Sequence, residues 1–348
     1  MTARDIPLYP LIFEPIYKPK VWGGRTLEAL GRTLPAGAIG ESWELVDLGA
    51  TSASGGGGGA ERSVVANGPL RGKSLHELMQ QYGDRLMGRL KPNATTAGFP
   101  LLVKFLDARE NLSVQVHPSP AYAREHDDAY LKSEAWYIVS AEPGAVIYKG
   151  IREGVTPDQL RAALAKNTDA AVVPLLVEVP VKPGDCHYLP SGTCHALGAG
   201  ILVAEVQTPS DTTFRVYDWG RVGRELHVEQ AIACITFGPA DTRQYEKRTH
   251  IAGMFTAVSR LVSCEHFRIE KVRMSQGYGQ EVPYNQPAVW IVLEGEGVLE
   301  TAEADPVPFH DGQTLLLPAG MDGAKVQLTA DTVWLEVTFP QALAEQIA

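Results

Sequence analysis

The chain has 348 residues, of which 45% are hydrophobic and 21% charged, and its 31 basic and 41 acidic residues give a net charge of −10. This composition excludes a wholly disordered or collagen-like chain and indicates about two globular domains. The acidic balance argues against nucleic-acid binding, the lack of a long apolar run argues against a membrane protein, and the charged, proline-containing start argues against a signal peptide, so we expect a cytoplasmic protein.

In chain order, the first marked segment is the Gly/Ser-rich run at 51–60, which is typical of a flexible surface loop. Apolar residues at helical spacing behind Ser74 predict a helix over 74–90. A second helix is predicted over 156–165, where Thr156 is suited to cap its first turn. Most of the remaining sequence consists of short Val-, Ile-, Leu- and Tyr-rich runs between Gly, Pro and Asp turns, which predicts a mainly β protein with helical insertions.

One pattern occurs twice in the sequence. Residues 184–195 (GDCHYLPSGTCH) and 312–323 (GQTLLLPAGMDG) both read glycine, five residues, proline, one residue, glycine. Each copy follows an aromatic strand, and these strands align Trp136 with Trp290. The spacing between strand and motif is longer in the first copy because that copy contains the helix predicted over 156–165. The repeat predicts two related β units.

The repeat spacing resembles the second signature of the cupin superfamily, whose small jelly-roll barrels bind a metal in their interior. This resemblance implies two cupin-type jelly-roll units, a catalytic domain over 1–245 that carries the helical insertions and a degenerate domain over 246–348. In the alignment, Glu134 of the first copy falls opposite an alanine and His195 falls opposite a glycine. The polar groups of the first unit are therefore lost in the second.

Four polar side chains of the first unit are candidate metal ligands. Gln115 and His117 lie two residues apart in the predicted strand at 112–119 and therefore share one face. Together with Glu134 and His195 they offer one amide, one carboxylate and two imidazoles, a set that suits Zn²⁺ and also permits Fe²⁺ or Mn²⁺. We expect one zinc ion per chain.

Two residues near this set are expected to have structural roles. His187 lies before the turn at 190–192, and strand alternation does not carry through that turn to relate it to His195. Alternation turns Cys194 to the face opposite His195, so Cys194 is predicted to be a buried thiol.

Several linked segments resemble type I mannose-6-phosphate isomerase, also called phosphomannose isomerase, in its shorter bacterial form. They span nearly the whole chain in the order of the family, and the last of them is the most specific. The segments are PKVWGG from Pro19, GESWEL from Gly40, FPLLVKFLDARENLSVQVHPS from Phe99, KSEAWYIV from Lys132 and PSGTCHALGAGILVAEVQTPSDTTFRVYDWGR from Pro190. The five-glycine run at 55–59 is not part of the family pattern.

The resemblance implies a zinc-dependent aldose-ketose isomerase that interconverts D-mannose 6-phosphate and D-fructose 6-phosphate, with a small-molecule sugar phosphate as its partner. Carried over by position, it makes Arg215 a catalytic residue and places three further side chains in the sugar-phosphate pocket, namely Lys132, Lys104 and Glu205. It also gives the role of zinc ligand to the set Gln115, His117, Glu134 and His195. The sequence does not predict an oligomeric state.

Isomerisation moves a proton between C1 and C2 through an enediol, so it needs a general base and stabilisation of a developing oxyanion. Arg215 stays protonated at neutral pH, which suits the electrostatic role. Glu205 and Lys132 are both candidates for the base, and the sequence does not decide between them. Structural alternatives stand beside these roles: Arg215 in an ion-pair network with Asp211 or Asp218, and Glu205 as a salt-bridged strand residue.

The remaining pocket candidates each have two interpretations. Ser113 either contacts the phosphate or satisfies a backbone turn. Lys104 either binds the substrate or is a solvated residue at a strand edge. Glu41 is a candidate for substrate binding beside Trp22 and Trp43, which are core residues in the alternative interpretation.

Two other functions fit parts of the pattern. A cupin dioxygenase with Fe²⁺ would use His117, His195 and Glu134 as its facial triad, although a fourth ligand and the basic residues nearby argue against it. A non-catalytic sugar-phosphate-binding protein would be expected to lose Arg215, Lys132 or a ligand, and the sequence has all of them.

Overall fold

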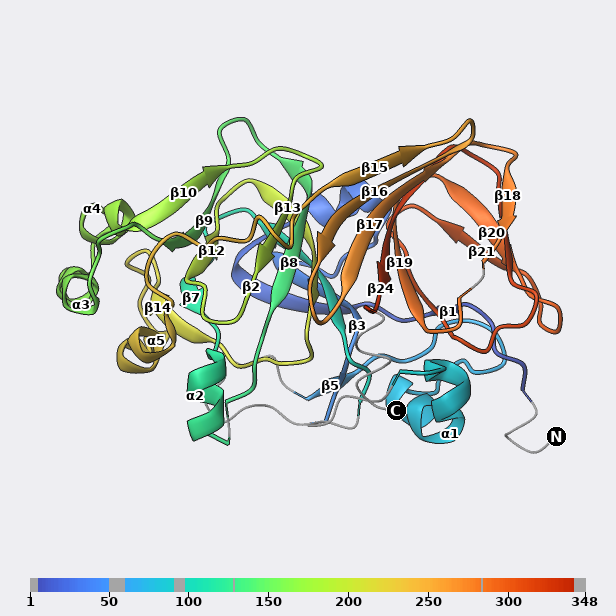
Figure 1. Cartoon of the computed structure of the whole chain (residues 1–348), viewed down its shortest axis with the longest axis horizontal. Coiled ribbons are helices and arrows are strands. Elements are labelled where there is room, and N and C mark those ends of the chain that lie inside the picture. Colours follow the sequence, from blue (N-terminus) through green and yellow to red (C-terminus); the bar gives the residue numbers. More distant parts are fainter. Residues whose placement is uncertain (1–5, 50–59, 91–97, 128, 283, 341–348) are drawn as a thin grey trace.

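The computed structural model describes residues 6–49, 60–90, 98–127, 129–282 and 284–340, so the glycine run at 55–59 lies outside the described residues. Two β units lie side by side, the first in blue to yellow and the second in orange to red (Figure 1). Helices are few and lie at the edges of these units. The prediction of a mainly β fold with helical insertions is confirmed.

The first unit consists of two facing sheets. The six-stranded sheet has the order β11 (Cys186–Leu189), β8 (Glu134–Ala141), β13 (Ile201–Gln207), β6 (Leu102–Ala108), β2 (Ile16–Gly24) and β3 (Ile39–Leu45). The five-stranded sheet has the order β10 (Leu176–Pro180), β9 (Val146–Ile151), β12 (His195–Leu197), β7 (Val114–Val116) and β14 (Phe214–Tyr217). A two-stranded ribbon, β4 (Asp47–Leu48) with β5 (Glu61–Arg62), lies beside them.

Apolar side chains close one part of the space between these two sheets. Trp136 and Ile138 of β8 pack there with Leu197 of β12 and Val203 of β13, and all four are buried. Alternation along β8 turns Glu134 to the same face as Trp136, so the space between the two sheets also contains this carboxylate. The same space therefore contains both a hydrophobic core and the candidate ligands.

The second unit has a seven-stranded sheet facing a four-stranded one. The first has the order β1 (Leu11–Ile12), β22 (Thr314–Leu317), β19 (Ala288–Glu294), β24 (Thr332–Thr338), β17 (Arg268–Met274), β16 (Thr256–Ser263) and β15 (Thr249–Ala252). The second has the order β18 (Gly279–Glu281), β23 (Lys325–Leu328), β20 (Glu296–Glu300) and β21 (Val307–His310). β1 comes from the start of the chain but pairs with β22 of this sheet. The division of the chain into domains at residue 245 therefore stays a prediction.

The two units share a hydrophobic core that includes helix α1 (Leu75–Met87). Ser74 and Glu77 form a capping box at its first turn, as the sequence predicted, and Gly88 with φ 59 ends the helix two residues before the predicted limit. Helix α3 (Pro157–Lys166) begins behind its Thr156 capping box, which confirms the second predicted helix.

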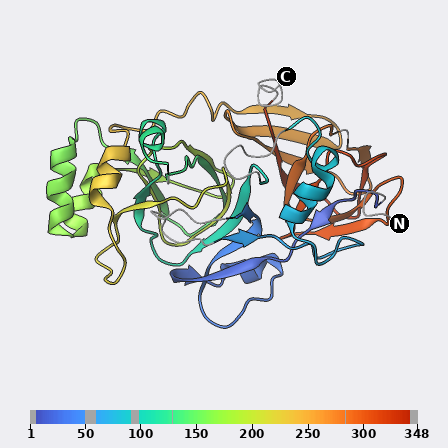
Figure 2. The same ribbon diagram turned by 90° about the horizontal axis from the view of Figure 1, so that it is seen from below.

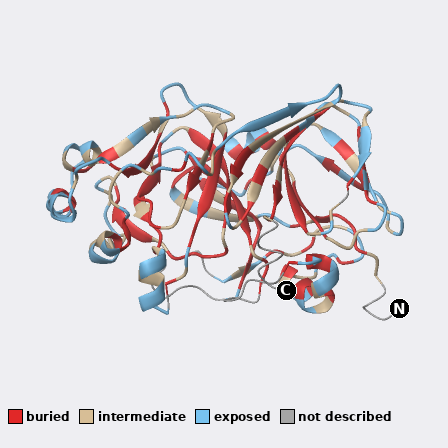
Figure 3. Cartoon of the chain, viewed as in Figure 1, coloured by how far each residue is buried: buried red, intermediate tan, exposed pale blue. Residues whose placement is uncertain are grey.

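The other helices are α2 (Pro120–Glu125), α4 (Asp169–Val172) and α5 (Val228–Cys234), with two short 3-10 turns at Thr26–Leu30 and Val173–Leu175. Figure 2 shows α3, α4 and α5 at the outer end of the first unit and α1 against the second. The strands that form the sheets are mostly buried, whereas β15 is exposed, α2 has no buried residue and α3 buries only part of its surface (Figure 3). No helix in the described part of the chain is long and apolar enough to cross a membrane.

The strand registers confirm the alignment of the two repeats. In the first unit, Trp136 of β8 lies opposite Glu205 of β13. In the second, Trp290 of β19 lies opposite Glu336 of β24. The two units therefore place a tryptophan and a glutamate at the same cross-strand position, although only the first contains the candidate ligands.

Candidate metal centre and substrate pocket

Three strand ends bring the candidate ligands together inside the first unit. His117 follows β7 directly, Glu134 begins β8 and His195 begins β12. Their ligand atoms all lie within 4.8 Å of one another, and all three side chains are buried. The Glu134 carboxylate is 3.3 Å from His117 Nε2 and 3.2 Å from His195 Nε2. The structure thus brings together three residues that are far apart in the sequence.

Backbone carbonyls fix which nitrogen of each imidazole faces the centre. His117 Nδ1 lies 2.9 Å from the Thr212 carbonyl oxygen, and His195 Nδ1 lies 2.8 Å from that of Thr193. A carbonyl accepts only, so each Nδ1 carries a proton and each Nε2 faces Glu134. Burial, together with the charge of Lys132, lowers the pKa of His117 to about 3, so this ring is neutral at pH 7.

The centre therefore brings together side-chain atoms of the kinds that bind metal ions. His117 Nε2 and Glu134 Oε1 are buried and have no hydrogen-bond partner among the described residues, while Glu134 Oε2 is ion-paired with Lys132. Burial raises the pKa of Glu134, but the positive charge of Lys132 outweighs that effect and holds the pKa well below its usual range. A carboxylate between two imidazole Nε2 atoms fits a divalent cation such as Zn²⁺, whose preferred ligands are of these types.

Gln115 lies next to this group. Its side-chain amide is 3.2 Å from His195 Nε2, and its backbone is opposite His195 in the β7–β12 pair. Its amide oxygen needs only a rotation of the terminal amide to point at the same centre. The geometry therefore allows Gln115 as a fourth ligand, as the sequence predicted, while its role stays a prediction.

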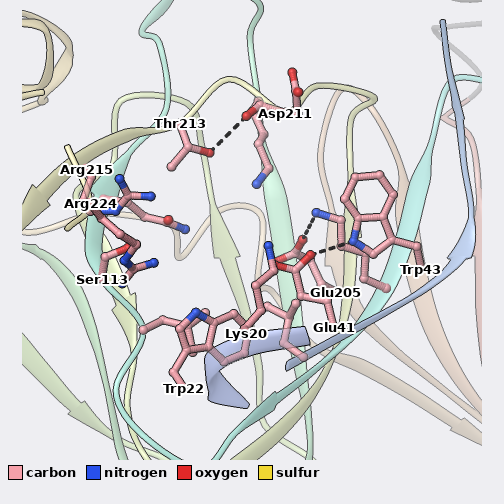
Figure 4. Close-up of a pocket in the computed structure, with 15 residues that line it drawn as sticks. Lys20, Trp22, Glu41, Trp43, Ser113, Glu205, Asp211, Thr213, Arg215 and Arg224 are labelled. Carbon is pink, nitrogen blue, oxygen red and sulfur yellow. Dashed lines mark hydrogen bonds and ion pairs between the residues drawn. The ribbon is translucent and has the colours of Figure 1, made fainter. Parts of the chain in front are cut away.

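A cavity of about 100 Å³ opens beside the centre, and Figure 4 shows the side chains that line it. Its walls include every pocket residue expected from the sequence, namely Glu41, Lys104, Ser113, Lys132, Glu205 and Arg215, as well as Trp22, Trp43 and Gln115. Four further polar residues were not expected there: Lys20, Asp211, Thr213 and Arg224. Lys20 lies inside the PKVWGG segment, and Arg224 lies three residues after the Pro190 block, so only proximity to family segments could have indicated them.

Glu205 lies at the centre of a buried network. Its Oε2 accepts a hydrogen bond of 2.8 Å from Trp136 Nε1, while its Oε1 lies 3.5 Å from Lys104 Nζ and has no hydrogen-bond partner among the described residues. Burial and the charge of Glu134 raise the pKa of Glu205. Since Lys104 is also buried, with its ammonium 4.6 Å from the centre of the Trp43 ring, its interpretation as a solvated strand-edge lysine is wrong.

Lys132 is paired with the ligand carboxylate. Its Nζ is 2.9 Å from Glu134 Oε2. Burial lowers the pKa of Lys132, but the charges of Glu134 and Glu205 outweigh that effect and raise it. Lys132 is therefore held as a cation.

Glu41 is held in its charged form. It accepts 2.6 Å from Trp43 Nε1 and lies 3.0 Å from Lys20 Nζ. Burial raises its pKa, but Lys104 and Lys20 bring that pKa down to about 2. Trp22 and Trp43 are buried and also line the cavity, so both interpretations of these tryptophans hold.

Arg215 lies with Ser113 and Arg224 on the side of the cavity opposite Glu205 and Trp43 (Figure 4). Its guanidinium donates 2.7 Å to the Glu225 carbonyl, and its buried Nε has no partner among the described residues. Burial and the charge of Arg224 lower its pKa. Asp218, proposed as an alternative partner, is instead ion-paired with Arg221 at 2.9 Å and with Arg224.

The two structural expectations can be placed as well. Cys194 is buried in the hydrophobic cluster outside the sheet interior, which confirms its prediction. His187 is paired with Trp136 across β11 and β8, and it is not among the residues that line the cavity.

Comparisons with known proteins give consistent results. Residues 12–141 match the sequence model of the phosphomannose isomerase type I catalytic domain. Mannose-6-phosphate isomerase ManA of Bacillus subtilis is 36% identical over 93% of this chain and 98% of its own length. The mannose-6-phosphate isomerase of Streptococcus mutans is 38% identical over 89% of this chain and 92% of its own.

Comparison with solved structures gives the same result as the sequence comparisons. The crystal structure of the Bacillus subtilis mannose 6-phosphate isomerase superposes with a TM-score of 0.81 at 30% identity, over 95% of this chain and 99% of that one. Variants of phosphomannose isomerase from Salmonella typhimurium, at 15% identity and a TM-score of 0.69, share the fold.

Proposed function

Because the chain belongs to the type I phosphomannose isomerase family and is therefore a mannose-6-phosphate isomerase, we propose that it works with one zinc ion per chain and through an enediol intermediate. The observation that supports a metal mechanism is the convergence of buried ligand atoms from His117, Glu134 and His195 beside the cavity. Lys132 is a counter-ion for one oxygen of Glu134, but both Nε2 atoms also face this carboxylate in a medium of low dielectric constant, and a bound cation would satisfy all three groups together.

His117, Glu134, His195 and the amide of Gln115 would hold the ion. When bound, zinc supplies a Lewis acid that orients and polarises the oxygens on C1 and C2 of the open-chain sugar. The neutral imidazole of His117 and the ionised carboxylate of Glu134 are already in the protonation states that coordination requires.

Glu205 is the proposed base. When the aldose is converted to the ketose, Glu205 Oε1 takes the proton from C2. The electrons of that C–H bond form the C1–C2 double bond, and the oxygen of the C1 carbonyl becomes the enediolate oxygen. The proton then returns to C1, and C2 becomes the carbonyl of the ketose after its hydroxyl proton moves to the oxygen on C1. The raised pKa of Glu205 suits a group that must both accept and return a proton.

The cationic side chains take the remaining roles. The charges of Glu134 and Glu205 keep Lys132 protonated, so we assign it to stabilising negative charge rather than to removing the proton. Arg215 is assigned to the developing oxyanion. Lys104, Ser113 and Glu41 are proposed substrate contacts. A cytoplasmic location, and the lack of nucleic-acid or membrane partners, stay predictions from composition.

Removal of the metal tests this mechanism. Protein purified without added metal is analysed for bound ions, stripped with a chelator, and assayed for fructose 6-phosphate formation before and after zinc, iron or manganese is added. We expect loss of turnover on stripping and recovery with zinc. Full turnover in metal-free protein would refute the metal mechanism, and recovery with iron alone would refute the choice of zinc.

A further inference from the structure

The indole of Trp136 touches two parts of the site without lining the cavity. Its Nε1 donates to Glu205 Oε2 at 2.8 Å, and its ring meets the His195 ring edge-on, with centroids 5.4 Å apart and an interplanar angle of 82°. The side chain is fully buried. The cavity lining includes Glu205 but not Trp136, so the indole has no direct access to a substrate bound there.

We propose that Trp136 is a positioning residue that fixes the Glu205 carboxylate so that Oε1 alone is presented to the substrate proton. This inference rests on the proposed role of Glu205 as the base. The carboxylate of a glutamate turns about three rotatable bonds and presents either oxygen unless one is held. Here Oε2 is occupied by the indole, whereas Oε1 is buried and has no hydrogen-bond partner among the described residues.

The strand arrangement explains why a tryptophan is suited to this task. Trp136 and Glu205 are directly opposite each other on β8 and β13, where side chains on one face lie within reach of each other. The indole has a single donor and few rotamers, and its contact with His195 restricts it further. Any shift of the ring would therefore affect the direction of the base and the packing of a proposed ligand together.

The second unit gives an internal comparison. Trp290 and Glu336 occupy the same cross-strand position there. The indole donates 3.1 Å to the Tyr284 hydroxyl, which in turn donates to Glu336 Oε2. A tyrosine thus stands between the tryptophan and the carboxylate in the unit that lacks the ligand set. Glu336 Oε2 also lies 3.5 Å from the indole N–H of Trp334, a neighbour on its own strand. Within this cross-strand pair, the direct 2.8 Å bond from the tryptophan to the carboxylate belongs to the unit that contains the cavity and the candidate metal centre.

The test uses Trp136→Phe, which keeps a ring but removes the N–H donor, with Trp290→Phe as the matched control at the equivalent buried position. For Trp136→Phe we expect kcat to fall at least about tenfold, because a hydrogen bond to a charged group is lost. KM and the amount of bound metal should change little. Trp290→Phe should leave kcat near that of the parent protein. Incorporation of 3-benzothienylalanine at position 136, which keeps the bicyclic shape without an N–H, gives a second test if the phenylalanine variant does not fold.

Glu205→Gln separates this inference from the base assignment. If Trp136 acts through the carboxylate, Glu205→Gln alone should lower kcat about a hundredfold or more, and adding Trp136→Phe to it should cause little further loss. An equal fall caused by Trp136→Phe in both backgrounds, or by Trp290→Phe, would overturn the positioning role. Full activity of Trp136→Phe beside an inactive Glu205→Gln would overturn the positioning role alone. Full activity of Glu205→Gln would overturn the base assignment and the inference with it.

Discussion

Replacement of Glu134 by glutamine is the most informative perturbation of the site, because this carboxylate is both a proposed ligand and the counter-ion of Lys132. Glu134→Gln keeps the shape of the side chain and removes one buried negative charge. Lys132 Nζ lies 2.9 Å from the carboxylate, a separation at which two unit charges attract by about 6 kcal/mol at an effective dielectric constant of about 20. Desolvation offsets part of this attraction, and loss of one partner of a buried pair costs about 3–5 kcal/mol.

We therefore expect Glu134→Gln to lose stoichiometric metal and turnover, and to lower the free energy of unfolding of the metal-free protein by about 3–5 kcal/mol. Urea unfolding in the presence of a chelator measures the stability, and metal analysis measures binding. The double variant Glu134→Gln with Lys132→Met removes both charges and should regain much of the lost stability, while it still binds no metal. A Glu134→Gln protein that keeps one ion per chain and full turnover would refute the proposed geometry.

Two further predictions follow from the same structure. Arg215→Ala should lower kcat by about two orders of magnitude while bound metal stays unchanged, and the exposed Arg243→Ala serves as its control; equal effects of the two would contradict the assignment. Burial and the charge of Lys149 lower the pKa of His187, so the unfolded chain binds this proton more readily and the free energy of unfolding should fall as the pH drops below about 6.5. Urea titrations between pH 7 and 5 should show a weaker pH dependence for His187→Gln than for the parent protein, and identical curves would show that His187 does not contribute.

Much of the fold is contained in local patterns. The helix behind Ser74 and the helix behind Thr156 were predictable because capping residues and apolar spacing act within a few residues. The repeat was predictable because both copies keep a turn that needs glycine and proline. The pairing of β1 with β22 was not predictable, since it joins the start of the chain to a strand about 300 residues later. In addition, β1 has only two residues, which is too short to show an alternating pattern of apolar and polar side chains.

The candidate site also contains residues that the sequence predicts and residues that it does not. His117, Glu134 and His195 could be found from their strand positions and the unequal repeat, and the structure brings them together. Lys20 and Arg224 could not, because each reaches the cavity from a different part of the chain, and the PKVWGG segment around Lys20 does not itself indicate a pocket residue. The direct bond from Trp136 to Glu205 depends on the register between β8 and β13, which the sequence of either strand alone does not specify.

The central claim is that one divalent cation binds between His117, Glu134 and His195. Anomalous diffraction from crystals grown with zinc, recorded above and below the zinc absorption edge, locates the ion without reference to activity. We expect one strong peak per chain, about 2.0–2.2 Å from the two Nε2 atoms and a Glu134 oxygen. A peak elsewhere in the chain with none between these three residues would contradict the account.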